Sequence, residues 1–314
     1  MRTDGLSFID VPGPVLQSVG GSATQAAAHG GATLPPALLE VVTVVAGGMA
    51  ATIVVLLFRR LRDGPSGRAP RDPALGALAM LVFIAAGGFG AMLAAGIGLG
   101  GDDPEYARLA RGTAGNLAQA ACAFAFLLSP LYPRGPRPTT PAMRAIGEGL
   151  VGFLLAMPLV AVVALLVGLL LVLVGHPPPP AVSHATLEIV RAKDDVIFTI
   201  ATLVQVAIVV PVAEEAGWRG LLQPAIRSGI LAFLGDRRPP GRLVPVGSVV
   251  VTGVLFTAVH WDAIPPDGRP AGLAMLLVLG IVLGGLRERT GGLVAPIVLH
   301  ALFNAVNLGV AVRA

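Results

Sequence analysis

The chain has 314 residues, of which 54% are hydrophobic and 13% charged, with a formal net charge of +4 and a mean hydropathy of +0.80. This balance excludes a soluble globular domain and indicates an integral membrane protein in a lipid bilayer. The basic residues are almost all arginines in short segments between apolar runs, without interleaved aromatics. This pattern favours membrane topology and no nucleic-acid partner.

Three regions follow one another along the chain. Residues 1–35 mix glycines, prolines and polar residues without the continuous apolar core of a signal peptide, and they are predicted to form a flexible N-terminal tail. Residues 36–194 are predicted to form N-terminal transmembrane helices. Residues 195–314 are predicted to form a C-terminal transmembrane core that carries the polar motifs.

The fold class predicted from the apolar runs is all-α, a polytopic transmembrane helical bundle. A helix that spans a bilayer needs about 20 mostly apolar residues, and the sequence offers about eight such stretches. They lie near 38–58, 74–98, 113–132, 146–175, 196–212, 244–261, 271–286 and 291–312. We therefore expect about eight membrane-spanning helices.

Arginine-rich segments follow the first, third, fifth and seventh predicted spans. Their arginines are Arg59, Arg60, Arg62, Arg68 and Arg71, then Arg134, Arg137 and Arg144, then Arg227, Arg237, Arg238 and Arg242, and finally Arg287 and Arg289. Because cytoplasmic loops carry an excess of Lys and Arg, all four segments are predicted to be cytoplasmic, with both termini outside.

The first polar motif is "PVAEEAGWRGLLQP", residues 211–224. Glu215 and Arg219 have the i,i+4 spacing of a helical ion pair, which lessens the cost of both charges near a membrane. Glu214 has no local partner, which suits a general base that works on water. A solvated helix start, with acids near its positive end, is the structural alternative.

Two further motifs place polar groups inside apolar helices. In "FTAVHW", His260 shares a helical face with Phe256, and in "HALFNAVN", His300 and Asn304 are one turn apart. Structural hydrogen bonds between helices would explain either motif. Taken with Glu214, however, one base, two imidazoles and an amide could converge on a metal ion or a polarised water molecule.

In order, "EEAGWRG", "FTAVH" and "HALFN" resemble the motifs EExxxR, FxxxH and HxxxN of the CAAX-protease and bacteriocin-processing family of intramembrane proteases. The resemblance covers roughly residues 195–310. It implies an intramembrane metalloendopeptidase that hydrolyses a peptide bond of a membrane peptide or protein, and it makes 195–314 the catalytic core.

Carried over to this sequence, the resemblance assigns a role to each motif residue. Glu214 would activate water, and His260 and His300 would position that water directly or through a divalent metal, with zinc expected. Asn304 would join the same cluster or stabilise the oxyanion. The supporting residues would be Glu215, Arg219 and Phe256, the last packed beside His260.

The predicted spans bring a geometric conflict. Glu214 would lie near the cytoplasmic end of the fifth span, whereas His260 would lie about 24 Å into the sixth from the same side, at 1.5 Å per residue. Either the helix that carries 213–228 folds back into the membrane after Pro211, or the sixth span starts later or tilts strongly. We expect an irregular or re-entrant segment here, which is tolerable only if it lines a cavity.

Two other functions remain open. A catalytically idle or immunity-type protein would bind a peptide partner in the same polar cavity, and a proton- or ion-coupled transporter would use the buried carboxylate and histidines as a relay. The abundance of Arg, Ala, Gly, Pro and Val suggests a GC-rich bacterial genome and a multi-pass protein of the bacterial cytoplasmic membrane. Neither the cleavage sequence nor the oligomeric state follows from the residues.

Overall fold

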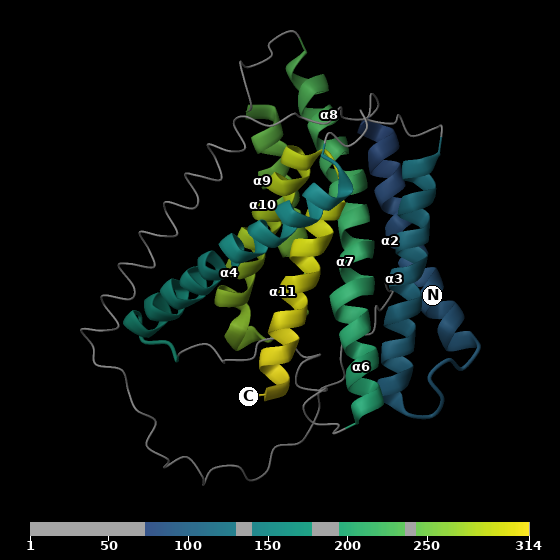
Figure 1. The fold of residues 1–314 in the computed structure, drawn as a ribbon. Coiled ribbons are helices and arrows are strands. Elements are labelled where there is room, and N and C mark those ends of the chain that lie inside the picture. The colour runs from purple at the N-terminus through teal and green to yellow at the C-terminus, as the bar shows by residue number, and fades with distance from the viewer. Residues whose placement is uncertain (1–72, 130–139, 178–194, 236–242, 314) are drawn as a thin grey trace, which may run out of the picture. The chain divides into compact units, whose positions relative to one another are not determined.

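The structure is a computed structural model, which describes residues 73–129, 140–177, 195–235 and 243–313 (Figure 1). All of these residues fall in the compact unit Thr43–Ala314. The predicted tail 1–35 and the predicted span 38–58 lie outside the described residues, as do most of the arginine-rich segments. The division between 36–194 and 195–314 stays a prediction.

The described residues form helices and no strands. The helices are α2 (Pro73–Gly96), α3 (Pro104–Leu128), α4 (Ala142–Leu173), α6 (Val196–Val204), η1 (Gln205–Val209), α7 (Val210–Glu215), η2 (Ala216–Leu222), α8 (Gln223–Leu234), α9 (Leu243–Ala258), η3 (Pro266–Gly268), α10 (Arg269–Thr290) and α11 (Val294–Arg313). The predicted all-α class is confirmed for these residues.

Within the described part of the chain, four helical stretches are long and apolar enough to cross a membrane. They are Pro73–Gly96, Ala142–Leu173, Val196–Leu234 and Pro266–Thr290. The stretches Leu243–Ala258 and Val294–Gly309 are shorter apolar helices. The chain is thus a multi-pass membrane protein, and the predicted number of about eight spans is not confirmed.

Local sequence signals set several helix ends. Asp103 caps α3 by accepting hydrogen bonds from the backbone N–H groups of Glu105 (2.9 Å) and Tyr106 (3.2 Å), and Asp195 caps α6 in the same way. At its C-terminal end, α10 is capped by Gly291, whose φ of 68° belongs to the left-handed region that glycine tolerates best.

The chain from Val196 to Leu234 is one continuous helical stretch of 39 residues. It contains two π-helical segments, η1 and η2, and α7 lies between them. Each π segment is followed by a proline, Pro211 or Pro224, as the second residue of the next α-helical segment. A proline clashes with the carbonyl one turn before it, and the wider π turn relieves that clash. The predicted irregularity is present, but the re-entrant fold-back after Pro211 is wrong.

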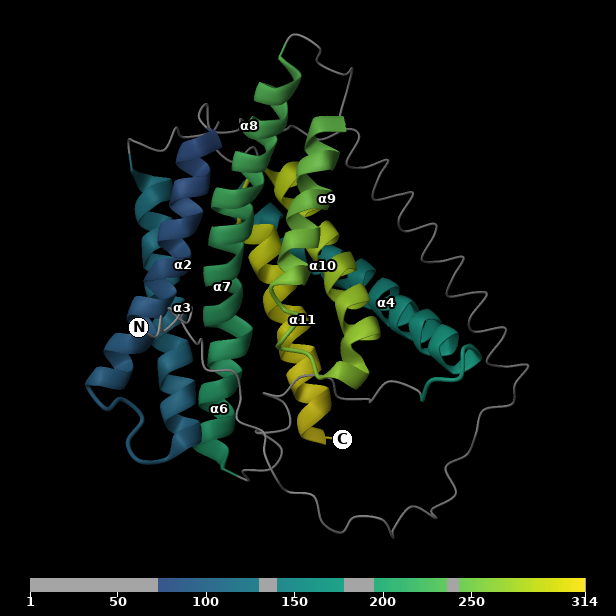
Figure 2. The same ribbon diagram turned by 180° about the vertical axis from the view of Figure 1, so that it is seen from behind.

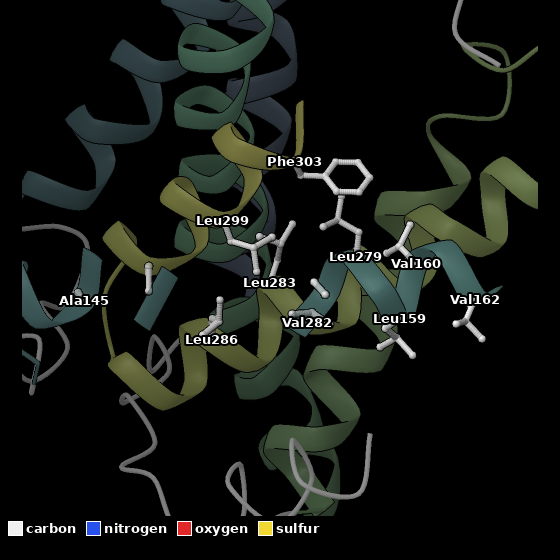
Figure 3. Close-up of a cluster of buried hydrophobic side chains, with 12 residues drawn as sticks. Ala145, Leu159, Val160, Val162, Leu279, Val282, Leu283, Leu286, Leu299 and Phe303 are labelled. Carbon is white, nitrogen blue, oxygen red and sulfur yellow. The ribbon is translucent and has the colours of Figure 1, made fainter. Parts of the chain in front are cut away.

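Two hydrophobic clusters hold the helices together. The first joins α4, α10 and α11 around the fully buried Leu283 and Leu299, and Figure 3 shows their side chains meeting between the three helices. The second joins α2, α3, η2 and α9 around Phe83, Leu221 and Phe256. The stretch 196–234 therefore packs on α2 and α3 on one side and reaches α9, α10 and α11 on the other.

The arginine-rich segments attach to helix ends that lie at one end of this unit. The start of α2 packs on α8, where a Cβ on Gly76 would lie 2.4 Å from the Cβ of Ala225. Arg289 at the end of α10 forms an ion pair with Glu148 near the start of α4. Figures 1 and 2 show the starts of α2 and α9 and the end of α8 together at this end. We call it the arginine-rich end.

At the opposite end, the first turns of α3 and α6 meet. The hydroxyl of Tyr106 donates to Asp195 at 3.0 Å, and the Tyr106 and Phe198 rings pack edge to face with centroids 5.2 Å apart. Leu308 of α11 joins Phe198 in a small buried cluster. The starts of α3 and α6 and the later part of α11 therefore lie at this opposite end.

Candidate active site

Glu214 and Glu215 end α7, and η2 begins at the next residue. They therefore lie in the middle part of the helical stretch Val196–Leu234, and the depth of Glu214 in the membrane stays a prediction. The apolar run was expected to end near residue 212, but the helix continues because the charges that follow are paired inside the protein.

Glu215 and Arg219 form a fully buried ion pair. Their side chains are 0% exposed, and Arg219 Nη1 lies 3.1 Å from Glu215 Oε1. The i,i+4 spacing thus produces the contact that a helix dictates, although η2 widens the turn between them. The pair lies in the protein interior rather than at a membrane edge.

Arg219 also binds groups from two other helices. Its Nη2 donates to the Gly280 carbonyl of α10 at 3.2 Å, and its guanidinium lies 4.6 Å from the centroid of the Phe256 ring of α9. In return, Arg287 of α10 donates from Nε to the Arg219 carbonyl at 3.2 Å. Arg219 is therefore the point at which the motif helix, α9 and α10 are joined.

His300 of α11 approaches the same carboxylate from the other side. Its Nδ1 lies 2.9 Å from Glu215 Oε1, and its side chain is nearly fully buried. Since Glu215 is paired with Arg219, its carboxylate accepts and His300 Nδ1 donates. This hydrogen bond fixes the imidazole so that its Nε2 points toward Glu214, 3.8 Å from Oε2.

His260 completes the arrangement from the turn after α9. Its Nδ1 lies 2.7 Å from the Phe256 carbonyl, which can only accept, and its Nε2 lies 3.8 Å from Glu214 Oε1. The Phe256 ring packs against both imidazoles, with centroids 4.7 Å from His260 and 6.1 Å from His300. The side chains of Glu214 and His260 are about one-fifth exposed.

Three acceptor groups therefore face one another. A neutral imidazole that donates from Nδ1 accepts at Nε2, so the lone pairs of two imidazoles point toward one carboxylate. At 3.8 Å these atoms are too far apart for direct hydrogen bonds. A water molecule, which can donate two protons, is the group that such a set of acceptors can hold.

Asn304 lies on α11 but is directed to another partner. Its Nδ2 donates to the Val206 carbonyl at 2.9 Å, which ties α11 to the π segment η1. Among the described residues, no hydrogen bond joins Asn304 to Glu214 or to either imidazole. The structure therefore brings Glu214, His260 and His300 together and places Asn304 beside them as a helix-to-helix contact.

A polar ladder that the motifs do not include continues from this centre. Gln223, one turn after Arg219, is fully buried, and its Nε2 donates to the Gly284 carbonyl at 3.2 Å and to Glu288 at 3.0 Å. The carbonyls that accept from Arg219 and Gln223 belong to glycines with the same four-residue spacing. The sequence signal for this ladder was the shared four-residue spacing, of Arg219 and Gln223 on one helix and of Gly280 and Gly284 on the other.

The donor set suits a divalent metal in type but is not placed as a metal site. Both imidazoles have Nδ1 fixed by a hydrogen bond and Nε2 directed inward, as metal-binding histidines do. A catalytic zinc site, however, takes three protein ligands. In the described part of the chain, no group of three or more His, Cys, Asp or Glu side chains is placed to hold a metal ion. The metal stays a prediction.

Residues 196–306 match the family model of type II CAAX prenyl endopeptidase Rce1-like proteins. This segment is therefore similar to the Rce1-like family. The matched range contains all three motifs, and it leaves α2, α3 and α4 outside. No curated protein and no solved structure matches the chain. The family resemblance expected from the motifs is confirmed, while the roles of individual residues stay predictions.

Proposed function

We propose that this protein is an intramembrane endopeptidase that hydrolyses a peptide bond of a membrane-associated peptide or protein. The Rce1-like match supports the reaction class. The observation that carries the proposal is the Glu214 carboxylate, which faces His260 Nε2 and His300 Nε2 at 3.8 Å each. This is a place for one water molecule beside a base.

In the proposed reaction, Glu214 is the general base. Its carboxylate takes a proton from the water molecule while the water oxygen forms a bond to the carbonyl carbon of the scissile peptide. When the tetrahedral intermediate collapses, the carbon–nitrogen bond breaks and Glu214 returns the proton to the leaving amine. The water molecule donates its second proton in a hydrogen bond to Nε2 of one imidazole, and neither imidazole needs to change its protonation.

The second carboxylate has a different task. Glu215 contacts neither water nor substrate in this proposal, because it is fully buried between Arg219 and His300. It is a positioning residue that holds the His300 ring with Nε2 directed at Glu214. Arg219 pairs with Glu215 and holds it in place, and Asn304 holds α11 against the helical stretch that carries both acids.

The test is quantitative profiling of new peptide N-termini in membranes of host cells that carry wild type or Glu214→Gln at matched abundance. Cleavages present only with wild type are expected, and they would also name the substrates. Identical profiles would contradict the proposal and favour a protein that binds peptides without cutting them.

A matched control comes from the arginine-rich end. Glu148→Gln makes the same chemical change in the ion pair with Arg289, outside the candidate site. Its cleavage profile is expected to resemble that of wild type. Loss of the same cleavages in both variants would show that the effect of Glu214→Gln is not specific to the site.

A further inference from the structure

The candidate site is closed toward the arginine-rich end. Along the helix in that direction, Arg219, Leu221 and Gln223 are all fully buried. Beyond them, Arg227 pairs with Glu288 at 2.9 Å across to α10. Packed and hydrogen-bonded side chains therefore fill the path from Glu214 to this end of the unit.

The turn after α9 is open by contrast. His260 lies in this turn, and its neighbours Val259 and Trp261 are 62% and 52% exposed. The side chain of Asp262 is 94% exposed. The partly exposed atoms of Glu214 and His260 thus adjoin the accessible surface of this turn rather than the closed ladder.

This turn also lies within the depth of a membrane span. Helix α9 starts at the arginine-rich end, where Gly247 packs near Ile230 of α8. Its 16 residues extend about 24 Å, short of the roughly 30 Å of a hydrocarbon core. Irregular backbone and exposed carboxylates at that depth require contact with water.

The turn is held by contacts with Arg269 at the start of α10. Its Nε donates to the Trp261 and Ile264 carbonyls, both at 3.1 Å. Its guanidinium lies 3.8 Å from Asp262 and 5.0 Å from the centroid of the Trp261 ring. These contacts hold the acidic turn in place beside His260.

We propose that the candidate site opens at this turn to the extracytoplasmic side, so that the substrates are peptides presented at that face of the membrane. The arginine-rich segments place the closed end in the cytoplasm, and the turn after α9 points to the other side. That these peptides are substrates rests on the proposed function, whereas the direction in which the site opens does not.

Cysteine labelling tests the direction. In a Cys122→Ser background, which removes the only cysteine, Asp262→Cys reports on the turn and Phe233→Cys reports on the arginine-rich end. Phe233 is a matched position because it is 91% exposed. A membrane-impermeant maleimide is added to intact bacterial cells or to permeabilised cells.

Asp262→Cys is expected to react in intact cells, and Phe233→Cys only after permeabilisation. The reverse order, or equal reaction of both in intact cells, overturns the proposal. Failure of Asp262→Cys to react even in permeabilised cells would show that the turn does not face water, which also overturns it. Asp267→Cys, exposed on the same loop, gives the same readout should Asp262→Cys not accumulate.

A second arm separates this inference from the proposed function. Labelling Asp262→Cys in intact cells with a bulky impermeant maleimide is expected to lower cleavage of the profiled substrates at least tenfold, with Phe233→Cys unaffected. Unchanged cleavage after complete labelling would contradict entry of the substrate beside this turn. If wild type cleaves nothing, the proposed function fails, and the labelling order still decides which way the site opens.

Discussion

The two parts of the polar centre differ in their surroundings although they adjoin in the chain. The sealed part, Glu215 with Arg219, is fully buried and makes all its contacts within the protein. The accessible part, Glu214 with His260, is about one-fifth exposed and has no direct hydrogen bond between its groups. The difference separates structural from chemical work, since a base must reach water and its support must not.

The largest effect on folding is expected in the sealed part. Arg219→Met leaves the Glu215 charge buried without its partner, which costs about 3–5 kcal/mol of unfolding free energy. Unfolding of the purified protein in detergent, followed by denaturant or heat, measures this loss. A melting temperature equal to that of wild type would show that the pair is not buried as described.

The double variant Glu215→Met, Arg219→Met sharpens this comparison. Glu215 Oε2 and Arg219 Nε are buried without a hydrogen-bond partner among the described residues, so the pair contributes little net stability. An apolar pair of similar volume is expected to recover most of the stability lost in Arg219→Met. Cleavage should stay low, because His300 has lost the carboxylate that orients it. Recovery of both properties would contradict the positioning role of Glu215.

In the accessible part, the main effect is expected on catalysis. His260→Ala removes an acceptor for the proposed water molecule and should lower the cleavage rate about a hundredfold, with little change in the melting temperature. His176→Ala, at an exposed position after α4, is the matched control and should leave the rate unchanged. A His260→Ala protein that cleaves like wild type would remove His260 from the site.

A smaller effect is expected where α11 meets η1. Asn304→Ala deletes the hydrogen bond to the Val206 carbonyl and should cost about 1 kcal/mol of stability. Asn304→Asp keeps the shape but cannot donate, so it should lose at least as much. If Asn304→Asp loses stability and Asn304→Ala does not, the cause would be the added charge rather than the lost donor.

The smallest effect is expected in the exposed turn after α9. Asp262→Asn breaks an exposed pair with Arg269 and should change stability by no more than about 0.5 kcal/mol. Thermal unfolding and cleavage rate are both expected to match wild type. A large loss in either would show that the pair holds the turn more firmly than the two Arg269 hydrogen bonds to backbone carbonyls.

Local spacing predicted the contacts that lie within one helix turn. The four-residue interval between Glu215 and Arg219 gave their ion pair, and the same interval placed His260 against Phe256. The three motifs in series also predicted the Rce1-like family, which the matched segment confirms. These features depend on helix geometry and on residue type, both of which are present in the sequence.

The position of Glu214 within its helical stretch and the partners of the polar groups depended on tertiary packing. Apolarity alone ended the fifth span near residue 212, because it cannot show that Arg219 is neutralised inside the protein. The carbonyls of Val206 and Gly280 bind side chains from other helices, and a sequence has no marker for such an acceptor. Pro211 was the local sign of the irregular helix, and it predicted an irregular or re-entrant segment where the structure has the wider turns of η1 and η2.

The most direct test is the cleavage rate per folded molecule of Glu214→Gln beside that of Glu215→Gln, each with its melting temperature. Glu214→Gln is expected to lose at least a hundredfold in cleavage rate at an unchanged melting temperature, whereas Glu215→Gln is expected to have a lower melting temperature than wild type. A Glu214→Gln protein that cleaves at the wild-type rate, or one that unfolds as early as Glu215→Gln, would contradict the division between an accessible base and its sealed support.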